Sequence, residues 1–266
     1  MKNAKIINIC NKKLIFLNYS ERTRSIYIHY MQKFTESLDK QIAHANALDF
    51  QMFIDNYKFT SVSQQNQIIS AIKFMYKFGL DKKYDKVKFE RPRTEKKLPQ
   101  IIDKTELLNS ISKIKNLKHK AIISLAYSVG LRVSEVINLK IEDIDSKRMI
   151  IYIKNAKGNK DRIVPLSENI LKLLRNYFKQ YKPKEYLFNG QNTKQYSNYS
   201  CNQIVKKYIS KDYHFHSLRH SCFTHLMENG NDTRIIQKLA GHSNIKTTER
   251  YIQVSKQTLN NIKLNI

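Results

Sequence analysis

The chain has 266 residues, and 41% of them are hydrophobic, which is enough to bury a core and excludes a largely disordered protein. Lys and Arg number 48 against 22 Asp and Glu, giving a formal net charge of +26. An excess of this size favours a polyanionic partner, because a cationic surface gains free energy by displacing counterions from phosphates. We therefore expect a nucleic-acid-binding protein; a merely basic composition is the simpler alternative.

The cysteines and the hydropathy pattern indicate the compartment. The three cysteines lie far apart and form no CxxC pair, which argues against a disulfide framework and fits a reducing cytosol. The basic segment Met1–Ser20 has one apolar patch, Leu14–Leu17, which is too short for a signal peptide or a membrane span. No other apolar run reaches spanning length, so we expect a cytoplasmic protein that does not associate with membranes.

Residues 20–79 are predicted to be helical. Apolar side chains recur at intervals of three and four residues in three successive stretches, and each stretch gives one apolar helix face. The faces comprise Tyr27, Tyr30, Met31 and Phe34, then Leu48, Met52, Phe53 and Tyr57, then Ile68, Ile69, Ile72, Phe74, Met75 and Phe78. The polar and basic residues between them predict a small all-helical DNA-binding domain over residues 1–90.

The composition changes abruptly after this helical region. Glu90–Pro99 holds two prolines, many charges and few apolar residues. Such a segment is typical of a linker between domains, although an ordinary surface loop has the same composition. We place a linker at residues 91–100 and a second domain at residues 101–266.

The second domain is predicted to be mostly helical with one β-hairpin. Asp103 is positioned to cap a helix, and a very apolar helix, His119–Val129, ends at Gly130. Alternating β-branched and aromatic residues flank a polar turn at residues 155–160, which indicates a hairpin. Further helices follow from Ser167 and Ser197. The fold class is therefore mainly α (α+β), with a small antiparallel sheet.

Arg132 and Glu135 form the first candidate site. Arg132 lies two residues after Gly130, where the buried helix ends, so its guanidinium is presented from a rigid base. A guanidinium fork binds phosphate through two parallel hydrogen bonds, and Glu135 is spaced to hold it in place. A structural Arg132–Glu135 ion pair is the plainer interpretation.

His216 and Arg219 form the second candidate site. They lie one helical turn apart, so an imidazole and a guanidinium are positioned to bind the same phosphate. His216 and His220 also have the i,i+4 spacing of paired zinc ligands, but no glutamate stands between them as in metalloproteases and no cysteine cluster completes a site. We therefore favour phosphate binding, and we expect His220 to lie on another face of the helix.

The third candidate site lies near the C-terminal end of the sequence. A short helix is expected to end at Gly241, so that His242 follows its end directly. The next helix is predicted to carry Tyr251. Because the chain holds 16 tyrosines, physical reasoning alone does not distinguish Tyr251 from a packing residue.

Taken in order, these motifs resemble the catalytic domain of the tyrosine recombinase or phage integrase family, which includes Xer-like site-specific recombinases. The segments GLRVSEV, HSLRH, LAGH and TTERY carry the resemblance, which extends from about Asp103 to Ser255. The family pattern is Arg, Lys in a hairpin turn, His-x-x-Arg, His or Trp, and Tyr. This sequence matches it with Arg132, Lys157, His216, Arg219, His242 and Tyr251.

The resemblance implies a role for each of these residues. Tyr251 would attack a DNA phosphate and form a 3′-phosphotyrosine, while Arg132, Arg219 and His242 would stabilise the charged transition state. Lys157 would protonate the departing 5′ oxygen, and His216 would assist proton transfer at Tyr251. Glu135 would play a supporting role by orienting Arg132 or a neighbouring histidine. Neither a metal nor another cofactor is expected. Lys154 and Lys160 flank the same turn, but only Lys157 directly precedes Gly158, as the family lysine does.

The expected partner is double-stranded DNA, held in a C-shaped clamp formed by the two domains. The resemblance implies a homo-tetramer, or a mixed tetramer with a related recombinase, assembled on DNA. Two alternatives stay open: a type IB topoisomerase-like or hairpin-forming relative, and a non-catalytic DNA-binding protein.

Overall fold

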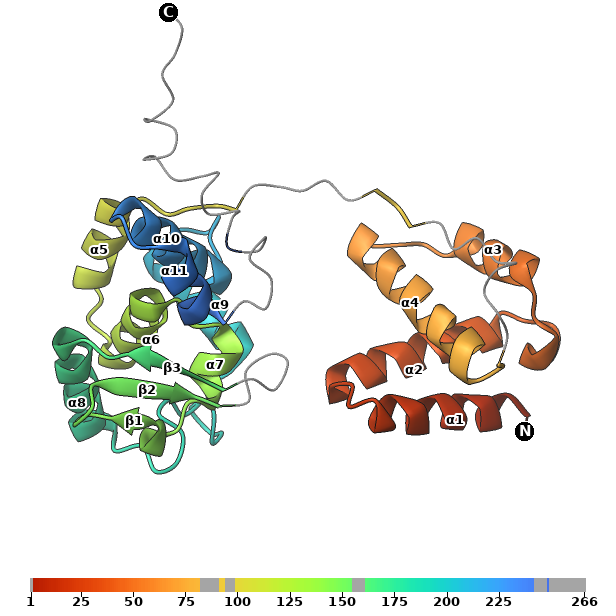
Figure 1. The fold of residues 1–266 in the computed structure, drawn as a ribbon, viewed down its shortest axis with the longest axis horizontal. Coiled ribbons are helices and arrows are strands. Elements are labelled where there is room, and N and C mark those ends of the chain that lie inside the picture. Colours follow the sequence, from red (N-terminus) through yellow and green to blue (C-terminus); the bar gives the residue numbers. More distant parts are fainter. Residues whose placement is uncertain (1, 82–90, 94–98, 155–160, 242–247, 249–266) are drawn as a thin grey trace, which may run out of the picture. The chain divides into compact units, whose positions relative to one another are not determined.

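The computed structural model describes residues 2–81, 91–93, 99–154, 161–241 and 248. The chain divides into two compact units, residues 1–96 and 97–266 (Figure 1). Among the described residues, no helix combines the length and the hydrophobicity needed to cross a membrane.

Unit 1 is a helical domain built around one apolar core. Its helices α2 and α4 pack against each other, and α1 lies against both. Polar side chains set the starts of the helices: Ser20 caps α2, Asn46 forms a capping box with Asp49 at α3, and Ser61 caps α4. The helices are α1 (Lys2–Phe16), α2 (Glu21–Glu36), the 3₁₀ turn η1 (Ile42–His44), α3 (Ala47–Asn56) and α4 (Val62–Phe78).

Two features of this unit were not predicted: an additional N-terminal helix, and a contact between the predicted linker and α4. Helix α1 precedes the region predicted to be helical, and of its described side chains only Cys10 and Leu14 are buried. Because so few positions face the core, the apolar period is weak. In the predicted linker, Arg91 donates hydrogen bonds to Asn66 and Ser70 of α4, so this part of the segment packs on unit 1.

Unit 2 combines helices with a small antiparallel sheet, as predicted. Helix α6 lies at its centre and packs against α8 and α10, while α11 packs against both α10 and strand β3 (Figure 1). The helices are α5 (Lys104–Ser112), α6 (Leu117–Val129), α7 (Val133–Asn138), α8 (Glu168–Tyr181), α9 (Asn198–Tyr208), α10 (Phe215–Glu228) and α11 (Thr233–Ala240).

The sheet has the strand order β1-β2-β3, with β1 (Ile144–Asp145), β2 (Ile150–Ile153) and β3 (Arg162–Pro165). The predicted hairpin corresponds to β2 and β3, which pair antiparallel with Ile153 opposite Arg162. The short strand β1, which follows the 3₁₀ turn η3 (Ile141–Asp143), was not predicted. Two residues are too few to display an alternating pattern.

Gly130 ends α6 in the left-handed conformation, with φ of 64°. A Cβ at this position would lie 2.4 Å from Cζ of Phe223, which α10 packs against this corner. Gly130→Ala is therefore expected to lower the free energy of unfolding by about 2–5 kcal/mol, because backbone strain and a steric clash add. Urea denaturation measures this difference.

Gly230→Ala provides the matched control. Gly230 has φ of 81°, but a Cβ there would have no neighbouring atom within 4 Å. This variant is expected to show the backbone strain alone, about 1–2 kcal/mol. Equal destabilisation by the two substitutions would contradict the proposed clash with Phe223.

Candidate active site

One buried carboxylate lies at the centre of the site. Glu135, in the first turn of α7, has a side chain that is 3% exposed and lies close to three arginines. Its oxygens accept hydrogen bonds from Arg132 and Arg162, and Nη1 of Arg219 lies 3.9 Å from Oε2. The structure thus brings together Arg132, Glu135 and Arg219, which the sequence placed in two separate motifs.

Arg132 is held from both its backbone and its side chain. It is the N-cap residue of α7; its backbone N–H donates to Oε2 of Glu135 at 2.8 Å, and Nη1 donates to Oε1 at 2.7 Å. The expected ion pair is therefore present. The arginine side chain nevertheless remains 19% exposed.

Arg219 is almost completely buried within α10, with 1% of the residue exposed. Its Nη1 donates to the carbonyl oxygen of Gly130 and its Nη2 to that of Ala240. The guanidinium carbon also lies 4.8 Å from the centre of the Phe223 ring. Arg219 therefore joins the end of α6 to the end of α11, and it places a fixed positive charge between them.

Arg162 belongs to this cluster, although the sequence analysis did not include it. Its Nη1 and Nη2 donate to the two oxygens of Glu135 at 2.7 and 2.8 Å, and Nε donates to the carbonyl of Leu239 at 2.9 Å. A signal was present in the sequence, because Arg162 shares a strand face with buried Val164. An arginine on the inner face of a strand requires a buried partner.

The arginines keep Glu135 ionised. Burial raises the pKa of the carboxyl, but the hydrogen bonds and charge of Arg162 and the hydrogen bonds of Arg132 outweigh it. The pKa of Glu135 falls from 4.5 to about 2. Three guanidinium charges and one carboxylate leave two positive charges in the cluster, which suits an anionic ligand such as a phosphate.

Glu135→Gln is expected to lower the free energy of unfolding by about 3 kcal/mol at pH 7, given ~1.4 kcal/mol per pKa unit. Because the folded-state pKa is depressed, the carboxylate stabilises the protein above pH 4.5 and loses this effect as the pH falls towards 2. The difference between wild type and variant should therefore shrink over that range. Urea denaturation at pH 7, 4 and 3 measures it.

Glu185→Gln is the control for this prediction. Glu185 pairs with Lys140 at 3.1 Å, but both side chains are at the surface, so a much smaller loss than for Glu135→Gln is expected. A constant difference between wild type and Glu135→Gln from pH 7 to pH 3 would contradict the assigned ionisation.

His216 lies next to the arginine cluster, one turn before Arg219 on α10. Burial of part of the ring, followed by the charges of Arg219, His214 and Arg132, lowers the pKa of His216 to about 4, although the residue keeps an exposed edge. The imidazole is thus neutral near pH 7 and is able to accept a proton. The expectation for His220 was wrong: its ring packs edge-to-face on His216, with centroids 4.5 Å apart, because residues four apart share a helix face.

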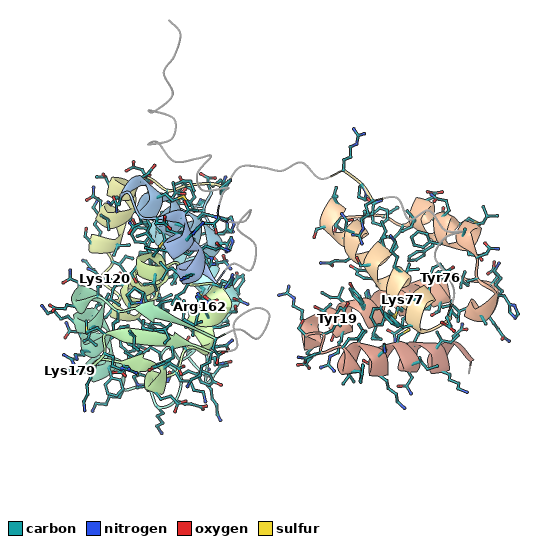
Figure 2. The ribbon with its side chains drawn as sticks, in the orientation of Figure 1. Tyr19, Tyr76, Lys77, Lys120, Arg162 and Lys179 are labelled. Carbon is teal, nitrogen blue, oxygen red and sulfur yellow. The ribbon has the colours of Figure 1, made fainter. Side chains whose placement is uncertain are left out.

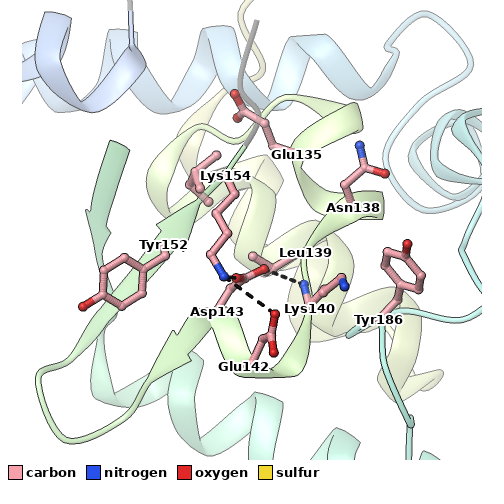
Figure 3. A pocket seen from close by; sticks show the side chains of 10 residues that line it. Glu135, Asn138, Leu139, Lys140, Glu142, Asp143, Tyr152, Lys154 and Tyr186 are labelled. Carbon is pink, nitrogen blue, oxygen red and sulfur yellow. Dashed lines mark hydrogen bonds and ion pairs between the residues drawn. The ribbon is translucent and has the colours of Figure 1, made fainter. Parts of the chain in front are cut away.

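Lys154, at the base of the predicted hairpin, forms ion pairs with two acidic residues. Its Nζ lies 2.6 Å from Oδ1 of buried Asp143 and 3.7 Å from Glu142, at one side of a cavity of about 370 Å³ that Glu135 also lines (Figure 3). Lys154 is half exposed, and its ion pair with Asp143 was not predicted. Its pairing with Asp143 leaves it a poor candidate for the hairpin lysine that acts on DNA.

Three predicted site residues, Lys157, His242 and Tyr251, lie outside the described residues. Described elements flank them in the sequence: β3 begins at Arg162, after Lys157, and α11 ends at Ala240, before His242 and Tyr251. Within the part that the structure describes, no group of three or more His, Cys, Asp or Glu is arranged to hold a metal ion. His225 of α10 is buried, and its Nδ1 lies 2.8 Å from the hydroxyl oxygen of Tyr127.

Two family models together match most of the chain. The model described as "Phage integrase family" matches residues 94–258, which include every candidate site residue. The model described as "Phage integrase, N-terminal SAM-like domain" matches residues 6–86.

Individual proteins are similar over nearly the full length. Tyrosine recombinase XerA of Pyrococcus horikoshii is 36% identical over 248 residues, which cover 90% of this chain and 86% of the relative. Tyrosine recombinase XerD of Staphylococcus epidermidis is 31% identical, with 90% of each chain covered. Among solved structures, the fold is shared with XerH site-specific recombinase, which was solved bound to difH substrate in a pre-cleavage complex. The TM-score is 0.72 and the sequence identity is 22%, with 97% of this chain and 83% of that chain covered.

Proposed function

Because this chain belongs to the phage integrase family of tyrosine recombinases, enzymes that break and rejoin DNA strands, we propose that it is a site-specific recombinase that cuts DNA with Tyr251. One observation supports this most strongly: Arg132 and Arg219, which are 87 positions apart, are gathered around the same buried carboxylate. A cluster with two net positive charges next to a neutral imidazole is suited to binding a phosphodiester.

In the proposed reaction, the phenol oxygen of Tyr251 attacks the phosphorus and displaces the 5′ oxygen of the next nucleotide. The phenol proton passes to His216, a neutral imidazole that has one ring nitrogen available to accept it. Lys157 donates a proton to the departing 5′ oxygen. The result is a 3′-phosphotyrosine and a free 5′ hydroxyl, and attack by a 5′ hydroxyl reverses the step and releases Tyr251.

The arginines stabilise the transition state of this reaction. Negative charge grows on the non-bridging phosphate oxygens, and fixed guanidinium groups neutralise it without having to reorganise. Arg219 is fixed by two backbone carbonyls and Arg132 by Glu135, and both are therefore held in place before the substrate arrives. His242 contributes a further hydrogen bond to the phosphate. With these cations present, the reaction requires neither a metal nor a nucleotide cofactor.

The proposed substrate is double-stranded DNA, in keeping with the net charge of +26. Solved neighbours include XerH bound to its difH substrate. We assign residues 1–90 to DNA binding, residues 91–100 to a linker and residues 101–266 to catalysis, with the two domains clamping the duplex. Assembly into a homo-tetramer, or a mixed tetramer with a related recombinase, would bring two DNA sites together in the cytoplasm.

Trapping of covalent complexes tests this proposal. The full chain is incubated with fragmented genomic DNA of its source in EDTA, without nucleotides, and the reaction is stopped with detergent. Protein–DNA complexes that survive denaturation are expected, and sequencing the bound DNA should return one recurrent site. The absence of any covalent complex would contradict cleavage by this chain. Complexes without sequence preference would instead favour a topoisomerase-like relative.

A further inference from the structure

Arg162 takes no part in the proposed reaction, although several hydrogen bonds hold its side chain in the arginine cluster. It is the first residue of β3 (Figure 2) and lies five positions after Lys157 in the sequence. Its side chain is only 8% exposed, and three of its N–H groups are bound to Glu135 and Leu239. Arg162 is thus held by contacts within the protein, and the proposed reaction assigns it no contact with DNA.

Arg162 fixes the point at which the chain leaves α11. The last carbonyls of a helix have no partner within the helix. Here Arg162 binds the carbonyl of Leu239, and Arg219 binds that of the next residue, Ala240. The following residue, Gly241, has φ of 61°, and a Cβ there would lie 3.1 Å from Cδ of Arg162. The chain towards His242 and Tyr251 therefore starts from a position set by two arginines.

Arg162 also limits how Glu135 binds Arg132. A carboxylate and an arginine readily form two parallel hydrogen bonds. Arg162 takes this bidentate arrangement, and among the described contacts the side chain of Arg132 donates to Glu135 through Nη1 alone. If Arg162 were absent, Oε2 of Glu135 would keep only the backbone N–H of Arg132 and would have room to accept a second N–H from its guanidinium. That guanidinium would then turn inward, away from a bound phosphate.

From these contacts we infer that Arg162 is a positioning residue for DNA cleavage. It holds Glu135 and the end of α11 in one arrangement, which keeps Arg132 directed at the phosphate and sets the start of the segment that leads to Tyr251. This inference rests on the proposed function. It assigns Arg162 no contact with the substrate, so its loss should slow the chemical step and leave DNA binding intact.

The test measures binding and cleavage separately. The DNA is a duplex carrying the site recovered from trapped complexes, nicked next to the cleavage position so that the cut strand is lost and religation is prevented. Arg162→Met keeps most of the side-chain volume but removes the charge and all N–H groups. Arg162→Lys keeps the charge but loses the planar fork. Arg175→Met, an exposed arginine on α8, is the matched control.

Arg162→Met is expected to bind the duplex with wild-type affinity in a gel-shift assay, and to cleave it roughly 10²-fold more slowly in single turnover, the scale of a small misplacement. Arg162→Lys should fall between Met and wild type, and Arg175→Met should match wild type. If the Met variant does not fold, a slower Lys variant with normal affinity supports the inference equally.

If Arg162→Met cleaves at the wild-type rate, the inference is overturned while the proposed function stands. The same conclusion follows from Arg162→Lys where only that variant folds. A loss of DNA affinity that accounts for the whole loss of cleavage also overturns it. Failure of the wild type to form any covalent complex overturns the proposed function, and this inference with it.

Discussion

Tyr251→Phe is expected to abolish covalent complex formation and to lower the cleavage rate at least roughly 10⁴-fold, the scale of losing a nucleophile. Phenylalanine keeps the ring but lacks the oxygen that forms the bond to phosphorus, so no other group replaces it. DNA affinity should be unchanged, since the ring keeps its size. A suicide duplex resolved on a denaturing gel measures cleavage, and a gel shift measures affinity.

Tyr199→Phe is the matched control for this prediction. Tyr199 lies on α9 with 73% of the residue exposed, and the same oxygen is removed there. This variant should form covalent complexes at the wild-type rate. A Tyr251→Phe variant that still forms covalent complexes would assign the nucleophile to another side chain.

Arg132→Met is expected to lower the cleavage rate about 10³-fold, because one fixed donor to the developing phosphate charge is lost. The fold should tolerate this change, since Glu135 retains both hydrogen bonds from Arg162. Arg219→Met is less informative, because Arg219 is buried and also holds two backbone carbonyls. Single-turnover cleavage, combined with thermal unfolding, separates the catalytic loss from a loss of stability.

Arg132→Lys separates the effect of the positive charge from that of the guanidinium geometry. Lysine preserves the positive charge but does not reproduce the bidentate fork, so a rate between those of Met and wild type is expected. If Arg132→Met cleaved as fast as wild type in an assay in which Tyr251→Phe is inactive, this would contradict a role for Arg132 in binding the phosphate.

Most helices of the fold followed from the sequence, because each combined an apolar period with a capping residue. Helix α6 is the clearest case, since its apolar run stops at Gly130. Helix α1 did not follow, because few of its side chains face the core. Strand β1 did not follow either, because two residues are too few for an alternating pattern to be recognised.

Part of the arginine cluster was predictable from the sequence, but its connections were not. The motifs identified Arg132, Glu135 and Arg219, whereas the link through Arg162 depends on a contact across 27 positions of the chain. The pairing of Lys154 with Asp143 was missed for the same reason, because tertiary contacts between distant segments leave no local spacing. The i,i+4 relation of His216 and His220 was local, and it should have placed both rings on one face.

The central claim is that Arg132 and Arg219 hold the phosphate that Tyr251 attacks. A crystal structure of the full chain with its nicked DNA site and orthovanadate, which imitates a five-coordinate phosphorus, tests it most directly. The account predicts vanadium bonded to Oη of Tyr251, with both guanidinium groups within hydrogen-bonding distance of its non-bridging oxygens. Vanadate bonded to another side chain, or held without Arg132 and Arg219, would contradict the account.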